Sequence, residues 1–348
     1  MNINIENLVR ENIRQLKPYF SARQEFSGDA DILLDANENP FGSPLNVNYN
    51  RYPDPNQTEL KKMLSEINHI SPDHIAVENG SDMLIDHICR IFCIPGKDNI
   101  IVLPPTFTMY EVAAYTNGNE VREVPLDQDF KMNTQKILSV ADENTKVIFL
   151  CSPNNPTANN MNRDEMEKLI NQFNGIVVVD EAYNSFSNQK SFIPDLPKFN
   201  NLIVLQTLSK AWGLAGLRVG IAYTSTLIAG YLNKVKTPYN LNVASQQFAI
   251  EALAQTDKVN AWISETKEQR NILSEALKSF DFVETVFPSE TNFILVKVKD
   301  ADRLYHYLIS KKIIVRNQSH KVLLANCLRI SIGTPDENKQ LIDVLKKF

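Results

Sequence analysis

The stretch NLIVLQTLSKAWGLAGLRVG, residues 201–220, contains an apolar run that is followed by hydroxyl groups and one lysine. The aliphatic residues Leu202 to Leu205 predict a short strand that is buried on both faces. Lys210 then follows at the carboxyl end of that strand. Most lysines are solvated surface charges, but ligand sites in open α/β sheets lie outside the carboxyl ends of strands. This position predicts that Lys210 lies in a crevice and has partners there.

Similar apolar runs recur along the chain and alternate with amphipathic helical segments. They cover residues 99–105, 145–153, 175–183, 201–207 and 218–224. Runs without polar alternation are typical of strands that are buried on both faces, and such strands form mostly parallel sheets between layers of helices. We therefore expect a large α/β domain.

The pattern changes near residue 242. Residues 242–280 have apolar residues recurring at three and four positions, which indicates a long helical stretch between domains. Residues 282–298 and 327–334 are typical of antiparallel strands around a helix at 300–312, and segment 30–42 is expected to join them. The predicted units are 1–45, an N-terminal arm with part of the small domain, 46–245, the large domain, and 246–348, the interdomain helix with the C-terminal small α+β domain.

Composition and charge argue against several classes of function. The 348 residues carry a formal net charge of -5 and no long basic run, so no nucleic-acid partner is expected. The N-terminus lacks the pattern of a secretory signal, and no run of about 18 apolar residues predicts a membrane span. Four cysteines are too few for a disulfide framework, which favours the reducing cytoplasm. His87, Cys89 and Cys93 have no second ligand pair, so we expect core cysteines and no metal site.

Polar residues gather at the ends of the predicted strands. Gly80, Ser81 and Asp82 precede a helix, where backbone N–H groups can bind an anion, although Ser-Asp is also an ordinary helix cap. Asn155 lies in SPNNPTA, residues 152–158, which alone could be a turn. The remaining candidates are Asp180 and Tyr183 in VVVDEAY, and Thr207, Ser209 and Arg218 around Lys210. A lysine, a buried aspartate, an asparagine, a tyrosine and an anion cup are the parts of a pyridoxal 5'-phosphate site.

The order and spacing of SPNNPT, VVVDEAY and TLSKAWGLAGLRVG resemble the fold type I aminotransferases. The resemblance implies a mostly parallel, seven-stranded sheet covered by helices, and pyridoxal 5'-phosphate as cofactor. It implies that Lys210 holds the cofactor and moves the substrate proton, while Asp180 pairs with the ring nitrogen. It further implies that Asn155 and Tyr183 bind the 3-oxygen. The implied phosphate ligands are Gly80, Ser81, Asp82, Thr207, Ser209 and Arg218.

Further segments, among them LLDANENPFGSP, NRYPDP, PPTFTMY, IIVRNQ and CLRISIGTPDEN, resemble the histidinol-phosphate aminotransferases over nearly the whole chain. This family implies amino exchange between L-glutamate and imidazole acetol phosphate, giving 2-oxoglutarate and L-histidinol phosphate in histidine biosynthesis. Tyr110 is implied to stack on the cofactor ring. Tyr52 is implied to reach the cofactor phosphate from the other subunit of a homodimer. The implied substrate ligands are Tyr19, Asn37, Asn155, Arg316 and Arg329, with Arg329 binding either the carboxylate or the phosphate.

Two residues depart from the pattern of many relatives: Ala158 stands where glycine is usual, and Met83 where glutamate is usual. We expect Ala158 to alter a turn and Met83 to remove one charge, with the ligands retained. Three alternatives stay open: an aromatic amino acid aminotransferase, a threonine-phosphate decarboxylase, and a regulatory or scaffold protein that kept the fold without the chemistry.

Overall fold

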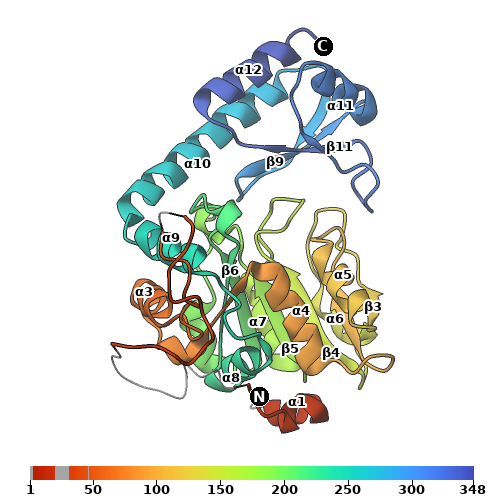
Figure 1. Ribbon diagram of the computed structural model, residues 1–348. Helices are drawn as coiled ribbons and strands as arrows, with labels where there is room; N and C mark the ends of the chain where they lie inside the picture. The colour runs from red at the N-terminus through yellow and green to blue at the C-terminus, as the bar shows by residue number, and fades with distance from the viewer. Residues whose placement is uncertain (1–2, 20–30, 46) are drawn as a thin grey trace.

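The computed structural model describes residues 3–19, 31–45 and 47–348. Its large domain is built on a seven-stranded sheet in the order β1-β7-β6-β5-β4-β2-β3 (Figure 1). The strands are β1 (Ile75–Asn79), β2 (Asn99–Val102), β3 (Glu120–Glu123), β4 (Thr145–Cys151), β5 (Ile176–Asp180), β6 (Leu202–Thr207) and β7 (Val219–Thr224). Only the pairings of β7 with β1 and β6 are antiparallel. The predicted mostly parallel, seven-stranded sheet is confirmed.

Helices cover both faces of this sheet because its central strands are apolar on both sides. In β5, Val177 and Val179 belong to one hydrophobic cluster, while Ile176 and Val178 belong to another on the opposite face. All four side chains are almost fully buried. The helices are α1 (Glu11–Gln15), α3 (Thr58–Asn68), α4 (Ser81–Phe92), α5 (Met109–Thr116), α6 (Thr134–Val140), α7 (Arg163–Gln172), α8 (Thr226–Val235) and α9 (Val243–Leu253).

A smaller C-terminal domain lies beyond the carboxyl ends of the central strands (Figure 1). Its sheet has the order β10-β11-β9-β8 and is antiparallel throughout. Its elements are α10 (Thr256–Lys278), β8 (Val283–Val286), β9 (Phe293–Val298), α11 (Ala301–Ser310), β10 (Arg316–Asn317), β11 (Cys327–Ser331) and α12 (Pro335–Leu345). Its core contains Leu273, Ile294, Leu308, Leu328 and Leu341. The long helix α10 connects the two domains.

The helical stretch expected over residues 242–280 is interrupted. Helix α9 ends at Leu253, and Gln255 leaves the helical region before α10 begins. The Gln255 amide bonds to the Ala252 carbonyl, which tightens the last turn, and the Thr256 hydroxyl donates to the Leu253 carbonyl. Side-chain hydroxyls that bond to nearby carbonyls compete with regular helix, and this explains the break.

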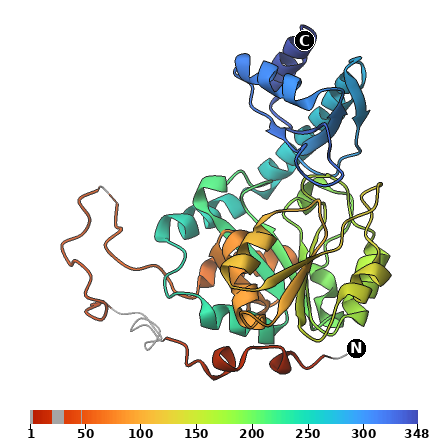
Figure 2. The same ribbon diagram turned by 90° about the vertical axis from the view of Figure 1, so that its right-hand side faces the viewer.

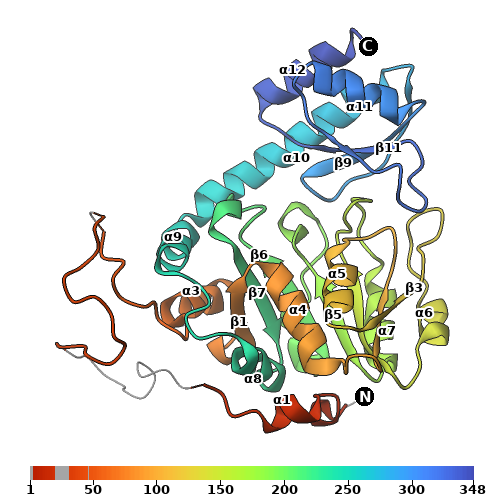
Figure 3. The same cartoon turned by 45° about the vertical axis from the view of Figure 1, so that its right-hand side comes forward.

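The prediction that segment 30–42 joins the small domain is wrong for the residues the structure describes there. Residues 31–42 extend to one side of the large domain, away from the blue C-terminal domain (Figures 2 and 3). The Glu38 carboxylate accepts from Arg51 Nη1 and from the Tyr52 amide, and these bonds hold the segment at the large domain. Farther upstream, Ile5 and Val9 pack in a large-domain core. Residues 20–30 and residue 46, which adjoins the predicted domain boundary, lie outside the described residues.

Candidate active site

A cavity of about 230 Å³ lies at the carboxyl ends of β4, β5 and β6, below the small domain. It brings together most of the predicted site residues from segments far apart in the sequence. Its walls include Ser81, Asp82, Asn155, Asp180, Tyr183, Thr207, Ser209, Lys210, Arg218 and Arg329. Parallel strands end at the same edge of a sheet, and this explains why the loops after β4, β5 and β6 meet here.

Lys210 follows β6 and lies on the wall of this cavity. Its Nζ is 5.4 Å from the ring centroid of Tyr183. Desolvation lowers the pKa of Lys210, and the nearby cation Arg329 lowers it further, against the attraction of Asp180 and Asp82. A lowered pKa increases the neutral fraction of the amine at a given pH, and the neutral amine is the nucleophilic form.

Asp180 is the last residue of β5 and is only 3% exposed. Its Oδ2 accepts a hydrogen bond from the Tyr110 hydroxyl at 2.7 Å, and its Oδ1 accepts from the Ala182 amide at 3.0 Å. Burial raises the pKa of Asp180, whereas both hydrogen bonds oppose that shift. The site therefore contains a deep carboxylate that fixed donors help to keep charged.

The start of α4 is open toward the cavity. Its N-cap is Gly80, with φ +81°, which has no side chain to cap the helix, and Ser81 and Asp82 come after the cap position. A Cβ at Gly80 would collide with the Arg218 guanidinium, and a Cβ at Gly220 would collide with the backbone of Gly80 and Ser81. Only glycine allows this close approach of Arg218 and β7 to the helix start, where the first N–H groups have no partner within the helix.

Hydroxyl and guanidinium groups complete a cradle around this helix start. Arg218 Nη2 donates to Asp82 Oδ2 at 3.1 Å, and Nη1 lies 3.5 Å from Ser209 Oγ. The Thr207 hydroxyl donates to Ser209 Oγ at 3.0 Å. Backbone N–H groups at a helix start, hydroxyls and an arginine are the donors that phosphate prefers.

Arg329 reaches the cavity from β11 of the small domain. Its Nη1 donates to Asn155 Oδ1 at 2.6 Å, a contact that joins the two domains. Burial lowers the pKa of Arg329, and the guanidinium lies 5.3 Å from the ring centroid of Phe293. Arg316 is directly opposite Arg329 in the β10–β11 pair, but it is exposed and does not line the cavity.

The prediction that Tyr110 stacks on a ring in the cavity is wrong. Tyr110 has no exposed surface and stacks on Phe149, with ring centroids 4.8 Å apart. Phe107 lines the cavity in its place and makes a T-shaped contact with Tyr110, with ring centroids 5.6 Å apart. Both aromatics belong to PPTFTMY. Helix α5 begins at Met109, which turns Tyr110 toward the sheet and leaves Phe107 in the preceding loop.

Tyr19, Asn37 and Tyr52 are not brought to Lys210 within the chain. They line a second cavity of about 1010 Å³ beside the large domain. Tyr52 is 52% exposed and stacks on Tyr239 at 4.4 Å. The structure thus divides the predicted residues into one group around Lys210 and another on this separate surface.

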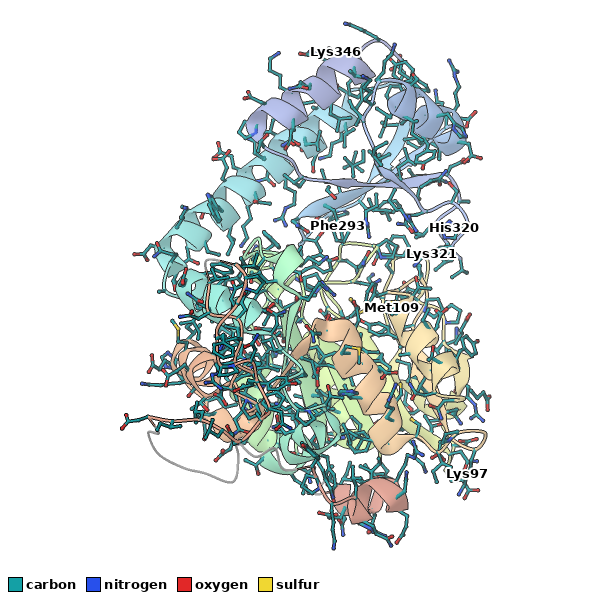
Figure 4. The ribbon with its side chains drawn as sticks, viewed as in Figure 1. Lys97, Met109, Phe293, His320, Lys321 and Lys346 are labelled. Carbon is teal, nitrogen blue, oxygen red and sulfur yellow. The ribbon has the colours of Figure 1, made fainter. Side chains whose placement is uncertain are left out.

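Sequence reasoning also missed Lys321, which lies with Phe293 at the edge of the small domain that faces Met109 (Figure 4). Its Nζ donates to the Thr106 carbonyl at 2.7 Å, next to Phe107 on the cavity wall. Lys321 follows IIVRNQ by three residues, but nothing in that spacing indicates a contact with the other domain.

Ala158 has φ +67° and is completely buried, so it holds the left-handed turn in which glycine is usual. Its methyl group packs in a small cluster with Tyr183 and Phe293. Met83 is 37% exposed on α4. Neither departure removes a group that lines the cavity.

Residues 32–345 match the family described as aminotransferase class I and II, and the chain belongs to this family. The chain is 50% identical over 345 residues to the histidinol-phosphate aminotransferase of Bacteroides fragilis strain YCH46, covering 99% of each chain.

Solved structures of related enzymes share the fold. The histidinol-phosphate aminotransferase of Sinorhizobium meliloti, solved in complex with pyridoxal-5'-phosphate, has a TM-score of 0.79 at 24% identity and covers 90% of each chain. The L-threonine-O-3-phosphate decarboxylase of Porphyromonas gingivalis has a TM-score of 0.73 at 25% identity, covering 86% of this chain and 91% of that one. No helix in the described part of the chain is long and apolar enough to span a membrane.

Proposed function

We propose that this chain transfers an amino group between L-glutamate and imidazole acetol phosphate, giving 2-oxoglutarate and L-histidinol phosphate, with pyridoxal 5'-phosphate as cofactor. The observation that carries the proposal is the meeting of Lys210, Asp180 and Arg329 in one cavity. The 50% identity to a histidinol-phosphate aminotransferase over 99% of both chains supports the choice of substrate.

The donor set of the cavity fits this cofactor. The uncapped start of α4, with Ser209, Thr207 and Arg218, would hold its phosphate. Asp180 would pair with its ring nitrogen. Bound pyridoxal 5'-phosphate supplies an electron-withdrawing ring that makes the Cα proton of an amino acid removable.

The other residues have roles that follow from their charge and place. The amine of Lys210 anchors the cofactor and then takes and returns the substrate proton. Burial raises the pKa of the Tyr183 phenol, so this group stays protonated and donates, with Asn155, to the ring 3-oxygen. Phe107 supplies the apolar wall against the ring.

Arg329 binds an anionic group on each substrate in turn. A guanidinium presents a planar pair of donors that matches both a carboxylate and a phosphate. One arginine can therefore serve L-glutamate and L-histidinol phosphate in alternate half-reactions. The proposed substrate set also includes Arg316, opposite Arg329 in the β10–β11 pair, and Tyr19 and Asn37, which line the second cavity of the chain.

The proposed active unit is a homodimer in the cytoplasm. Ile32, Leu34 and Phe41 are 77%, 86% and 95% exposed, and a second copy would bury these apolar side chains. The same association would bring Tyr52 of one copy to the phosphate cradle of the other. The four cysteines are all free and buried, a state that a reducing compartment maintains.

A half-reaction measurement tests the proposed substrate. The cofactor-loaded protein is mixed separately with L-histidinol phosphate, L-phenylalanine and O-phospho-L-threonine, and the absorbance of the bound cofactor is followed with carbon dioxide release. We expect amino transfer from histidinol phosphate at far lower concentration than from phenylalanine, and no carbon dioxide. Preference for phenylalanine would indicate an aromatic aminotransferase, and carbon dioxide from phosphothreonine would indicate a decarboxylase. No reaction with any of them would favour a protein without the chemistry.

A further inference from the structure

We propose that Tyr110 is a positioning residue, whose buried hydroxyl holds the Asp180 carboxylate charged and aimed at the cofactor ring nitrogen. This inference rests on the proposed function, which assigns Asp180 to that nitrogen. Tyr110 would act only through Asp180, because it does not line the cavity.

Packing leaves the Tyr110 ring almost no freedom. The ring is completely buried and lies nearly parallel to Phe149, with an interplanar angle of 10°. Phe107 contacts it edge-on at an interplanar angle of 86°. A ring that is held on two sides delivers its hydroxyl to one place, and that place is 2.7 Å from Asp180 Oδ2.

The hydrogen bond fixes the direction of the Asp180 carboxylate as well as its charge. With Tyr110 on Oδ2 and the Ala182 amide on Oδ1, each carboxylate oxygen has one protein donor. A carboxylate accepts further hydrogen bonds, so it can still accept one from the ring nitrogen. Removing either donor would leave a buried oxygen unpaired and allow the group to rotate.

The groups that face Tyr110 and Asp180 keep the Tyr110 hydroxyl protonated, so that it can donate to the carboxylate. Burial and the neighbouring Asp180 raise the pKa of Tyr110, so the hydroxyl retains its proton. Burial also raises the pKa of the Cys151 thiol, so no thiolate competes for that proton. Lys210 favours the charged form of Asp180, whereas Asp82 opposes it.

Tyr223 provides a matched control for Tyr110→Phe. It is also a buried tyrosine of the large domain, on β7, and its hydroxyl accepts from Asn68 Nδ2 at 3.0 Å. Tyr223→Phe therefore removes one buried hydroxyl and its hydrogen bond at a site that does not include Asp180. If Tyr110→Phe acted only by destabilising the fold, Tyr223→Phe would show the same effect.

The test compares the wild type, Tyr110→Phe and Tyr223→Phe as apoproteins. Each is titrated with pyridoxal 5'-phosphate and with its 1-deaza analogue, in which carbon replaces the ring nitrogen, and Kd is obtained from the cofactor absorbance. A lost hydrogen bond to a charged group predicts about tenfold weaker binding of the natural cofactor by Tyr110→Phe. We expect Tyr223→Phe to match the wild type.

The deaza analogue separates positioning from packing. The analogue has no ring nitrogen for Asp180 to bind. We therefore expect the wild type and Tyr110→Phe to bind it with Kd values within about twofold of each other. The comparison is a double-mutant cycle in which the second change is made in the cofactor. Equal losses with both cofactors, or no loss with either, would overturn the inference.

The pH dependence of Kd gives a second readout. Tyr110→Phe removes a hydrogen bond that lowers the pKa of Asp180, so the loss of cofactor binding on acidification should begin at a higher pH than in the wild type. An unchanged profile would contradict the role. If the wild type binds the cofactor but leaves histidinol phosphate unreacted, the proposed substrate fails while these binding results still decide the role of Tyr110.

Discussion

At the scale of single residues, the environment of Lys210 predicts how the apoprotein captures its cofactor. Desolvation and Arg329 lower the pKa of this amine from 10.5, so the reactive neutral form becomes abundant at a lower pH than for a free lysine. The rate of cofactor capture should rise with pH and reach half of its maximum below 10.5. Stopped-flow absorbance over a pH series measures this rate. Lys210→Ala should show no covalent capture at any pH, and a midpoint at or above the free-lysine value would contradict the prediction.

A second prediction at this scale concerns Arg329 and is independent of the one for Lys210. Arg329→Ala should weaken binding of both L-glutamate and L-histidinol phosphate by about 100-fold, because each loses a paired, charge-assisted contact. The concentration dependence of each half-reaction gives the two affinities. Arg303→Ala is the control, since Arg303 lies over Phe348 in the same domain, away from the cavity. Weakening of only one substrate would contradict the shared-anion role.

At the scale of elements, hydrogen bonds to Glu181 connect the end of β5 to residues 191–192 and to β6. It is 4% exposed and accepts from the Ser191 hydroxyl, the Phe192 amide and the Gln206 amide. Burial raises its pKa from 4.5 to about 7, against these hydrogen bonds, so the folded state binds this proton more tightly than the unfolded state. The stability that Glu181 contributes is complete below pH 4.5 and is lost as the pH rises through about 7.

The size of this effect follows from the two pKa values of Glu181. A shift from 4.5 to about 7 corresponds to about 3 kcal/mol of the free energy of unfolding. Glu181→Gln should remove that part of the pH dependence, and the exposed Glu143→Gln should not. Urea unfolding of the apoproteins at pH values on either side of this range measures the difference. A wild-type slope retained in Glu181→Gln would show that another group is responsible.

Helices and strands could be predicted from the sequence where the burial of their side chains alone determines the pattern. The central strands appear as apolar runs because both faces are covered. The edge strand β3 has the sequence EVRE and is partly exposed, so it leaves no such run. The aromatics Phe107 and Tyr110 are three residues apart, and only the start of α5 decides which one faces the cavity. Local pattern thus predicts which residues belong to the site more reliably than which way they point.

At the scale of the whole molecule, the limits of sequence reasoning lie in contacts between distant segments. The pattern around Arg329 predicts a strand, but its bond to Asn155 spans 174 residues and depends on how two domains meet. The apolar residues of segment 30–42 suggest burial, yet Phe41 stays 95% exposed within one chain. The sequence pattern of a single chain does not indicate which molecule covers that surface.

Subunit mixing tests whether a second copy supplies that partner. In a symmetric dimer where Tyr52 acts across the interface, Lys210→Ala and Tyr52→Ala homodimers each lack one group in both sites. A mixed dimer pairs the intact Lys210 of one copy with the intact Tyr52 of the other, so one of its sites is complete. Random reassembly of equal amounts should therefore restore about a quarter of the wild-type activity.

The alternatives give different results in the same mixture. If Tyr52 served the cavity of its own chain, every site in the mixed dimer would lack one group and no activity would return. Mixing Lys210→Ala with Asp180→Ala is the control, because both residues line one cavity of one chain and complementation is expected to fail. A particle of one 39.5 kDa chain in sedimentation would also contradict the dimer. The exposure of Tyr52, at a cavity separate from that of Lys210, favours restoration.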